Sequence, residues 1–172
     1  MKKLSLTLAV AALAVAGAVH AQAPDDAQIA HIVVTANQVD IDAGKLASTK
    51  STNKDVQAFG KQTVADHTGV NQQATALATR LKVTPKDNPT SESLAKGGKD
   101  NIAKLNTLSG AAFDKAYVDN EVTYHQAVLD ALDKTLIPNA QNAELKNLLV
   151  TVRPAFVAHL EHAKSVQAKV GK

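Results

Sequence analysis

Apolar residues recur every three or four positions along four long segments of this sequence, and this spacing limits the fold more than any other feature. Such spacing places apolar side chains on one face of an α-helix, whereas a half-buried β-strand would require strict alternation. The β-branched residues are scattered rather than alternating, and the sequence contains no internal repeat. The sequence therefore predicts an all-α protein.

Prolines, glycines and N-cap residues divide the chain into helices. Asn53 is suited to cap the second long helix and Ser109 the third, which Pro138 should end. Gly97 and Gly98 weaken a shorter helix between these two. Four long helices with short loops and one extra short helix predict an up-down four-helix bundle. The expected helices cover about residues 26–49, 54–82, 91–106, 110–136 and 144–169.

The first 21 residues differ from the rest and are typical of a secretory signal peptide. The basic start MKK precedes the apolar run LSLTLAVAALAVAGAV, and VHA before Gln22 fits a cleavage site, with AQA before Pro24 as a second choice. An uncleaved membrane anchor is the alternative, but the run is short for a span of about 20 residues. We therefore expect a periplasmic protein with one helical domain, residues 22–172, and leave peripheral outer-membrane association open.

Composition excludes several classes of function. Removal of Lys2 and Lys3 lowers the formal net charge from +3 to about +1, and only 3% of residues are aromatic, so the clustered basic face of a nucleic-acid-binding protein is missing. The absence of cysteine excludes disulfides and thiolate metal sites. No catalytic motif such as Gly-x-Ser-x-Gly occurs, so we expect no enzyme. An envelope protein or a second copy of the chain remains as a partner.

Each long helix carries one ionisable residue on its predicted core-facing stripe, and these four residues are the candidate metal ligands. They are Asp40, His67, His125 and His159. Burial of an unpaired charge or imidazole is costly, so buried ionisable groups are normally paired or bound to metal. One carboxylate and three neutral imidazoles suit a divalent transition metal such as zinc, copper or iron.

Other interpretations of these residues stay open. Asp40 would pair with a lysine, or face outwards if the first helix is rotated so that Val39 and Leu46 face the core. Asp66 beside His67 would belong to the second shell of a site or hydrogen-bond outwards. Histidines without metal would serve packing or respond to acid in a non-catalytic interaction module, which predicts a loss of stability between about pH 7 and pH 5.

The depth of the residues along the helices also allows a split site. Folding the last two long helices about Pro138 places His125 about 10 Å in depth from His159. Glu121, one turn before His125, would then lie closer to the level of His159. His162 follows His159 at a common ligand spacing but lies off the stripe, so it is expected in the second shell or in solvent.

Three segments resemble the bacterial family called domain of unknown function 4142. They are FGKQTVADHTGVNQQATALATRLKV (59–83), LSGAAFDKAYVDNEVTYHQAV (108–128) and RPAFVAHLEHAK (153–164). The resemblance spans about residues 27–168. It implies an exported, ferritin-like four-helix bundle in the cell envelope, and it implies no established reaction.

This chain departs from the family and from ferritin-like enzymes at two places. The family usually shows a glutamate where Asp40 stands, so the carboxylate here has a shorter reach. Ferritin-like enzymes use Glu-x-x-His on two helices, whereas Val64 and Phe156 stand three residues before His67 and His159. We therefore expect no di-iron centre and no ferroxidase or oxygenase chemistry, and retain a histidine-rich site for a single copper or zinc ion.

Overall fold

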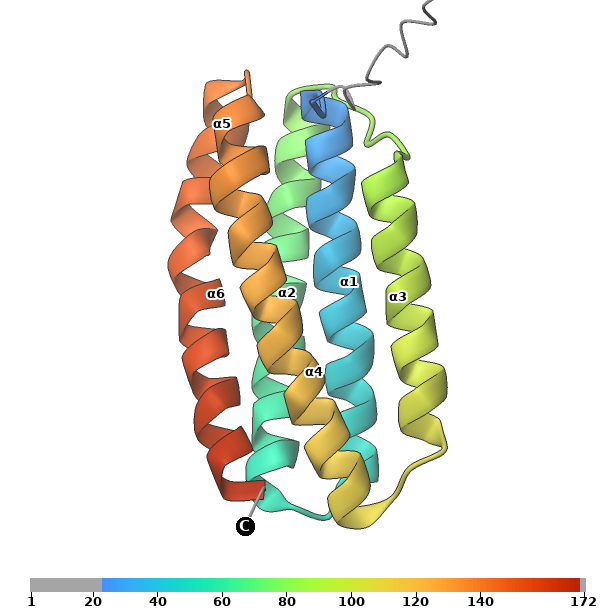
Figure 1. Cartoon of the computed structure of the whole chain (residues 1–172). Helices are drawn as coiled ribbons and strands as arrows, with labels where there is room; N and C mark the ends of the chain where they lie inside the picture. Colours follow the sequence, from blue (N-terminus) through green and yellow to red (C-terminus); the bar gives the residue numbers. More distant parts are fainter. Residues whose placement is uncertain (1–22, 171–172) are drawn as a thin grey trace, which may run out of the picture.

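A computed structural model describes residues 23–170, and this part of the chain consists of helices joined by loops, without a strand (Figure 1). The predicted signal peptide, residues 1–21, lies outside the described residues and stays a prediction. Within the described part, no helix has the length and apolar character that a membrane span needs. The elements are α1 (Asp26–Lys50), α2 (Lys54–Arg80), α3 (Pro89–Asn106), α4 (Gly110–Ala131), the π-helical segment η1 (Leu132–Leu136), α5 (Ile137–Asn139) and α6 (Ala143–Val170).

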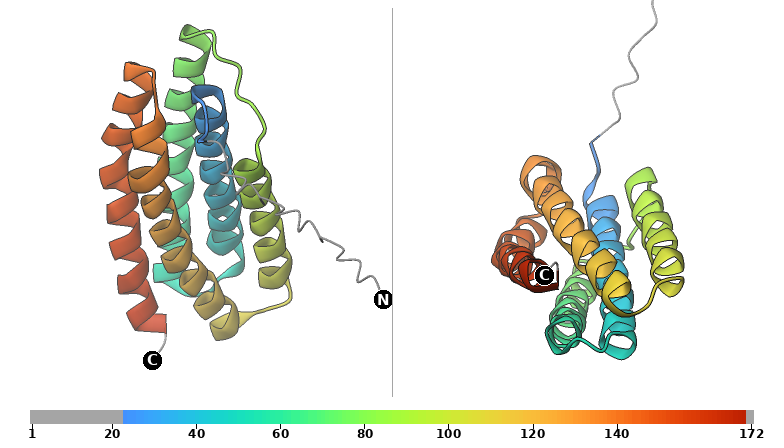
Figure 2. Two further views of the ribbon diagram at one scale, coloured as in Figure 1. Left: turned by 45° about the horizontal axis from the view of Figure 1, so that its top comes forward. Right: turned by 60° about the horizontal axis from the view of Figure 1, so that its bottom comes forward.

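The long helices lie side by side along a common direction. α1 and α6 run one way and α2 and α4 the other, because α3 returns the chain along the molecule between α2 and α4 (Figure 1). The up-down order therefore holds for the five long helices in chain order, whereas α2 and α4 run in the same direction. α3 packs against α1 on the side away from α6 (Figure 2). The all-α prediction is confirmed.

Capping side chains explain where the helices begin. The side chain of Asn53 accepts hydrogen bonds from two backbone N–H groups of α2, which confirms the predicted N-cap. Ser109 stands at the N-cap position of α4, but its side chain makes no capping hydrogen bond. The helix expected at 91–106 begins earlier, at Pro89, because Asn88 and Ser91 form a capping box.

Pro138 does not end the helical path where the sequence predicts. α4 continues into η1, and α5 carries the chain past Pro138 before it reverses near Asn142. Proline lacks an N–H group and its ring clashes with the carbonyl four residues earlier, and the wider π turn accommodates both effects. Asn142 lies midway in sequence between His125 and His159, whose ring centroids are 5.5 Å apart. The expected offset in depth between these histidines is therefore wrong.

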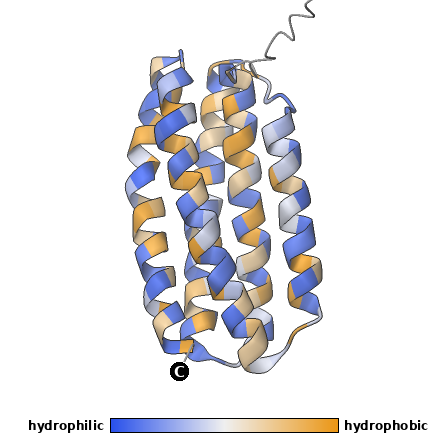
Figure 3. Ribbon diagram, in the orientation of Figure 1, coloured by the Kyte–Doolittle hydropathy of each residue, from blue (hydrophilic) through white to orange (hydrophobic). Residues whose placement is uncertain are grey.

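Two apolar cores fill the bundle, and a polar layer lies between them. One core contains Ile29, Leu77 and Leu149, and the other contains Phe59 and Phe113. Apolar and polar segments alternate along each helix, as expected for helices with one buried face (Figure 3). The buried polar residues that lie at mid-height between these cores are Asn37, Asp40, Thr63, His67, Glu121, His125 and His159.

Helices α1 and α2 approach each other closely at two glycines. A Cβ atom at Gly60 would lie 2.7 Å from the carbonyl oxygen of Gly44, and a Cβ atom at Gly44 would lie 2.8 Å from the carbonyl oxygen of Gly60. Such distances are too short for a real side chain, so both positions require glycine at this helix spacing. The close approach helps to place Asp40 of α1 beside His67 of α2.

We expect Gly60→Ala to lower the free energy of unfolding by about 1–3 kcal/mol, because the two helices must separate to admit the methyl group. Gly69→Ala on the same helix is the matched control, since a Cβ atom there meets nothing within 4 Å. Replacement of this helical glycine by alanine should raise the free energy of unfolding of the Gly69→Ala protein by up to about 1 kcal/mol. Equilibrium unfolding in urea measures both values, and equal effects of the two substitutions would contradict this account of the packing.

A candidate metal centre in the bundle core

The structure brings the four predicted ligands together in the polar layer. Asp40 Oδ2 lies 3.4 Å from His67 Nε2 and 3.9 Å from His125 Nε2. His159 Nδ1 lies 3.1 Å from His67 Nε2. None of the four residues is more than 5% exposed. Asp40 therefore faces the core beside imidazoles and not a lysine, and α1 is not rotated outwards.

An asparagine holds the ring of His67 in one orientation. Asn37 lies one turn before Asp40 on α1, and its amide nitrogen donates to the carbonyl of Val33 at 2.9 Å. The amide oxygen of Asn37 therefore faces His67, whose Nδ1–H donates to it at 2.6 Å. This hydrogen bond assigns the proton of the neutral ring to Nδ1 and leaves a lone pair on Nε2.

The other two imidazoles are anchored in the same manner. His125 Nδ1–H donates to the backbone carbonyl of Glu121 at 3.0 Å. His159 Nε2–H donates to the carboxylate of Asp66 at 2.8 Å. Each ring therefore donates one N–H to an oxygen outside the cluster, and its other nitrogen has a lone pair that points into the cluster. For these two histidines the inward nitrogens are His125 Nε2 and His159 Nδ1. Outer hydrogen bonds of this kind orient histidine ligands in metal sites.

The inward nitrogens have the spacing of metal ligands, and the Asp40 oxygen forms a second such group with Glu121 and His125. One ring nitrogen from each of the three histidines lies within 4.8 Å of the others. Ligand atoms at 2.0–2.1 Å from a tetrahedral zinc ion lie about 3.3 Å apart, close to the 3.1 Å from His67 to His159 and the 3.4 Å from His67 to Asp40. Two lone pairs that face each other at 3.1 Å repel unless a proton or a cation lies between them.

Several buried atoms beside these nitrogens have no hydrogen-bond partner among residues 23–170. They include Asp40 Oδ2, His125 Nε2 and both side-chain oxygens of Glu121. Glu121 is fully buried, with Oε2 at 3.6 Å from His125 Nδ1. A buried polar atom without a partner costs about 1–3 kcal/mol. Four such atoms in one layer reduce stability, and a ligand that accepts lone pairs could satisfy them.

Comparison with known proteins identifies the family. The family model described as Domain of unknown function (DUF4142) matches residues 11–166. The chain belongs to this family. Neither a curated protein nor a solved structure matches the chain. The resemblance seen in the sequence is thus confirmed, and the DUF4142 family brings no reaction with it.

Burial sets the protonation states in this DUF4142 protein. Burial, together with repulsion from the neighbouring imidazole of His159, lowers the pKa of His67 to about 3 and that of His125 to about 4. Burial also raises the pKa of Glu121 to about 8 and, together with repulsion from Glu121, holds the pKa of Asp40 well above its usual range. At neutral pH the imidazoles of His67 and His125 are therefore neutral, and the two acids retain protons that a divalent cation would displace.

Two residues predicted for the second shell have different places in the structure. Asp66 joins the layer through His159, although its side chain is 38% exposed. Burial raises its pKa, but hydrogen bonds from Gln62 and His159 outweigh this effect and leave the pKa lowered, so Asp66 stays ionised. His162 is exposed and packs edge-on against Phe59 at 5.0 Å between ring centroids. The DUF4142 structure therefore places Asp66 beside the cluster and His162 outside it.

The sequence interpretation missed Asn37. Only ionisable residues on a strict stripe were considered there, and Asn37 lies one position beyond the stripe residue Ala36. Its signal was available, because an amide one turn before a buried aspartate on the same helix face is expected to bond a neighbouring polar group. In this DUF4142 protein it decides which nitrogen of His67 faces the cluster.

Proposed function

We propose that this protein binds one divalent transition-metal ion, zinc or copper, in its bundle core and buffers, carries or senses that metal. Asp40, His67, His125 and His159 are the proposed ligands. Glu121 lies within reach of His125 as a further carboxylate, and Asp66 orients His159. A set of three imidazole nitrogens and one carboxylate oxygen suits these ions better than calcium or magnesium, which prefer oxygen ligands.

One observation carries the proposal. Each of the three imidazoles is hydrogen-bonded outwards through one nitrogen, to Asn37, Glu121 or Asp66, and turns the other nitrogen to the same point. Histidines that serve only packing have no need to share this orientation. The buried and unpartnered Oδ2 of Asp40 lies 3.4 Å from His67 Nε2, and it supplies the negative charge that a cation requires once the cation displaces its proton.

We also propose that the protein is a ferritin-like bundle that works in the periplasm after cleavage behind residue 21. The leader-like composition of residues 1–21 supports export. The antiparallel pairs α1–α2 and α4–α6, joined by one long connection through α3, support a ferritin-like order (Figure 1). The missing Glu-x-x-His motifs and the nitrogen-rich ligand set favour a mononuclear site over a di-iron centre.

Elemental mass spectrometry of the untagged protein, produced by export and purified without chelator, tests the metal proposal. We expect about one zinc or copper ion per chain, either as purified or after incubation with each salt and gel filtration. No metal after incubation with either salt would overturn the proposal. The histidines would then serve packing or a pH response in a non-catalytic interaction module.

We expect Asp66→Ala to weaken metal binding by about 10–100-fold without changing the stoichiometry, because His159 loses the carboxylate that orients it. Asp42→Ala is the matched control. Asp42 is also an α-helical aspartate that accepts a hydrogen bond from a glutamine four residues earlier, but it is exposed and lies away from the histidines. Calorimetric titration with zinc measures both affinities, and equal losses in the two variants would contradict an orienting role.

A further inference from the structure

An apolar cavity of about 240 Å³ lies between α1 and α4, next to the polar layer. Leu94 of α3 and Phe156 of α6 complete its walls. Small residues leave the space open, since Ala36 on α1 and both Ala127 and Ala131 on α4 line it. The cavity opens to solvent beside the exposed residues Thr90 and Ala127, and it reaches the buried residues Ala36 and Phe156.

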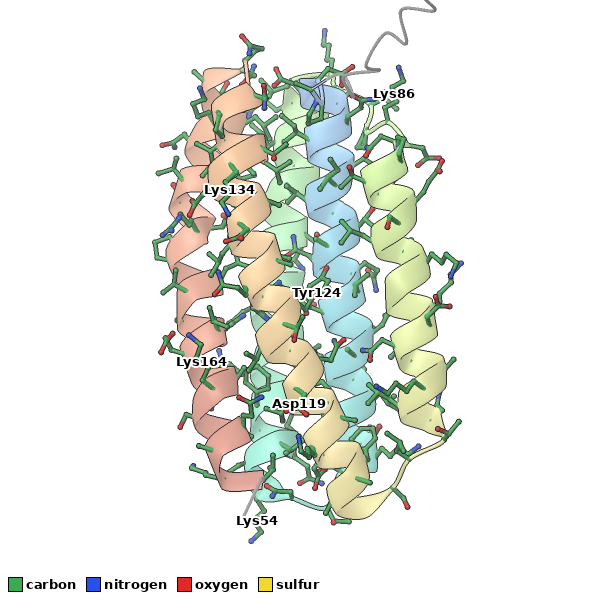
Figure 4. All side chains as sticks on the ribbon, viewed as in Figure 1. Lys54, Lys86, Asp119, Tyr124, Lys134 and Lys164 are labelled. Atoms are coloured by element: carbon green, nitrogen blue, oxygen red, sulfur yellow. The ribbon has the colours of Figure 1, made fainter. Side chains whose placement is uncertain are left out.

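The walls of the cavity select an uncharged ligand. None of its lining residues is charged, and its polar side chains are Thr90, Thr135 and Tyr124. Tyr124 lies at mid-height on α4 (Figure 4), and its hydroxyl donates to the carbonyl of Ala36 at 3.0 Å. Lysines such as Lys134 lie on the outside of the bundle (Figure 4). A cavity this poor in polar groups does not hold ordered water well, and an apolar cavity of about 150 Å³ accepts benzene.

The π-helical segment η1 forms part of the same wall. Leu132, Thr135 and Leu136, all within η1, line the cavity. A π turn interrupts the regular hydrogen bonding of a helix, and such turns are found mostly at functional sites. Pro138 explains why the π turn forms. Because the turn lies beside the cavity, its irregular backbone also shapes the cavity wall.

We infer that this cavity binds a small, uncharged, apolar molecule about the size of a substituted aromatic ring. The inference does not require the metal. It does link the two sites, because Phe156 lines the cavity and also packs edge-on against His67, with 5.1 Å between ring centroids. An occupant in contact with Phe156 therefore alters the surroundings of the candidate metal ligands.

Titration with p-xylene, followed by ligand-detected NMR on the chelator-treated full chain, tests the inference. We expect saturable binding of one p-xylene and, in protein-observed spectra of the same titration, a shift of the His67 imidazole resonances. The control ligand is 4-methylbenzoate, which has a similar ring and a charged carboxylate, and it should not bind because no lining group offsets its charge. Absence of saturable p-xylene binding, or equal binding of the two ligands, would overturn the inference whatever the outcome of the metal experiments.

A cavity-filling substitution locates the site. Ala131→Phe should weaken p-xylene binding at least tenfold, because the new ring occupies the cavity. Ala158→Phe is the control, since Ala158 is exposed on α6 and does not line the cavity. Ala131→Leu places a smaller apolar side chain at the same half-buried position and provides a second filling variant, should Ala131→Phe fail to fold by circular dichroism. Unchanged binding in a folded filling variant would contradict the location.

Discussion

The His159→Ala protein should bind zinc or copper at least about 100-fold more weakly than the unmodified protein. Loss of a ligand removes a metal–nitrogen bond, so its effect should exceed the 10–100-fold that is typical of residues that only orient a ligand. His159 is also the least disruptive ligand to remove. Its partner Asp66 is 38% exposed and can be hydrated after the substitution, whereas removal of His67 would leave the buried Asn37 oxygen without a partner.

His162→Ala is the matched control, because His162 lies one turn further along α6 and is exposed. It should retain the stoichiometry and affinity of the unmodified protein, and His67→Ala and His125→Ala should follow His159→Ala. Calorimetric titration with zinc measures the affinities, and circular dichroism verifies that each variant is folded. Full metal binding by folded His159→Ala, or loss in His162→Ala alone, would show that the ligands are not those proposed.

The helical stripes predicted these ligands because one face of each long helix must be buried. An ionisable residue on a buried face has to meet another polar group, and the four stripe residues Asp40, His67, His125 and His159 do meet in the structure. Their side-chain directions follow from the helix period alone. The relative depth of His125 and His159 did not follow, because it depends on how the chain passes Pro138.

The other features that the sequence did not predict, the π turn and the cavity, depend on how the helices pack together and not on the pattern within any one helix. A proline in a helical pattern predicts an end or a kink, and the sequence does not indicate that a π turn will absorb it. The sequence does not indicate the cavity beside η1 either. The alanines on α1 and α4 that line it come together only when the chain folds and α3 sets the path between α2 and α4. Apolar stripe patterns predict which face of each helix is buried, whereas the size and position of cavities between helices depend on tertiary packing.

The chelator-treated protein should lose stability as the pH rises from about 6.5 to 8, by about 2 kcal/mol for Glu121 and by a further amount for Asp40. Burial raises the pKa of Glu121 from 4.5 to about 8, and the pKa of Asp40 is raised in the same direction. In this range the folded protein holds protons that the unfolded chain has released. The unfolded state therefore binds fewer protons, and stability falls as the pH rises.

The histidines act in the opposite direction at lower pH. Burial lowers the pKa of His67 from 6.5 to about 3 and that of His125 to about 4, so below pH 6.5 the unfolded chain binds protons that the folded protein does not. Their contribution to stability is present above pH 6.5 and is lost as the pH falls. Between pH 4.5 and 6.5 the two acids offset the two imidazoles, so we expect little change there, instead of the loss that histidines alone predict.

Urea unfolding at pH 6.5 and pH 8 in the presence of chelator measures this dependence. Glu121→Gln keeps the side-chain volume and should reduce the loss of stability, because only Asp40 then releases a proton. Glu161→Gln is the control and should leave the loss unchanged, since Glu161 is exposed on α6. Stability that stays level or rises from pH 6.5 to pH 8 would mean that both acids are already ionised in the folded protein. Saturation with zinc should abolish the loss, because the ion takes the place of the protons that the buried acids would otherwise release.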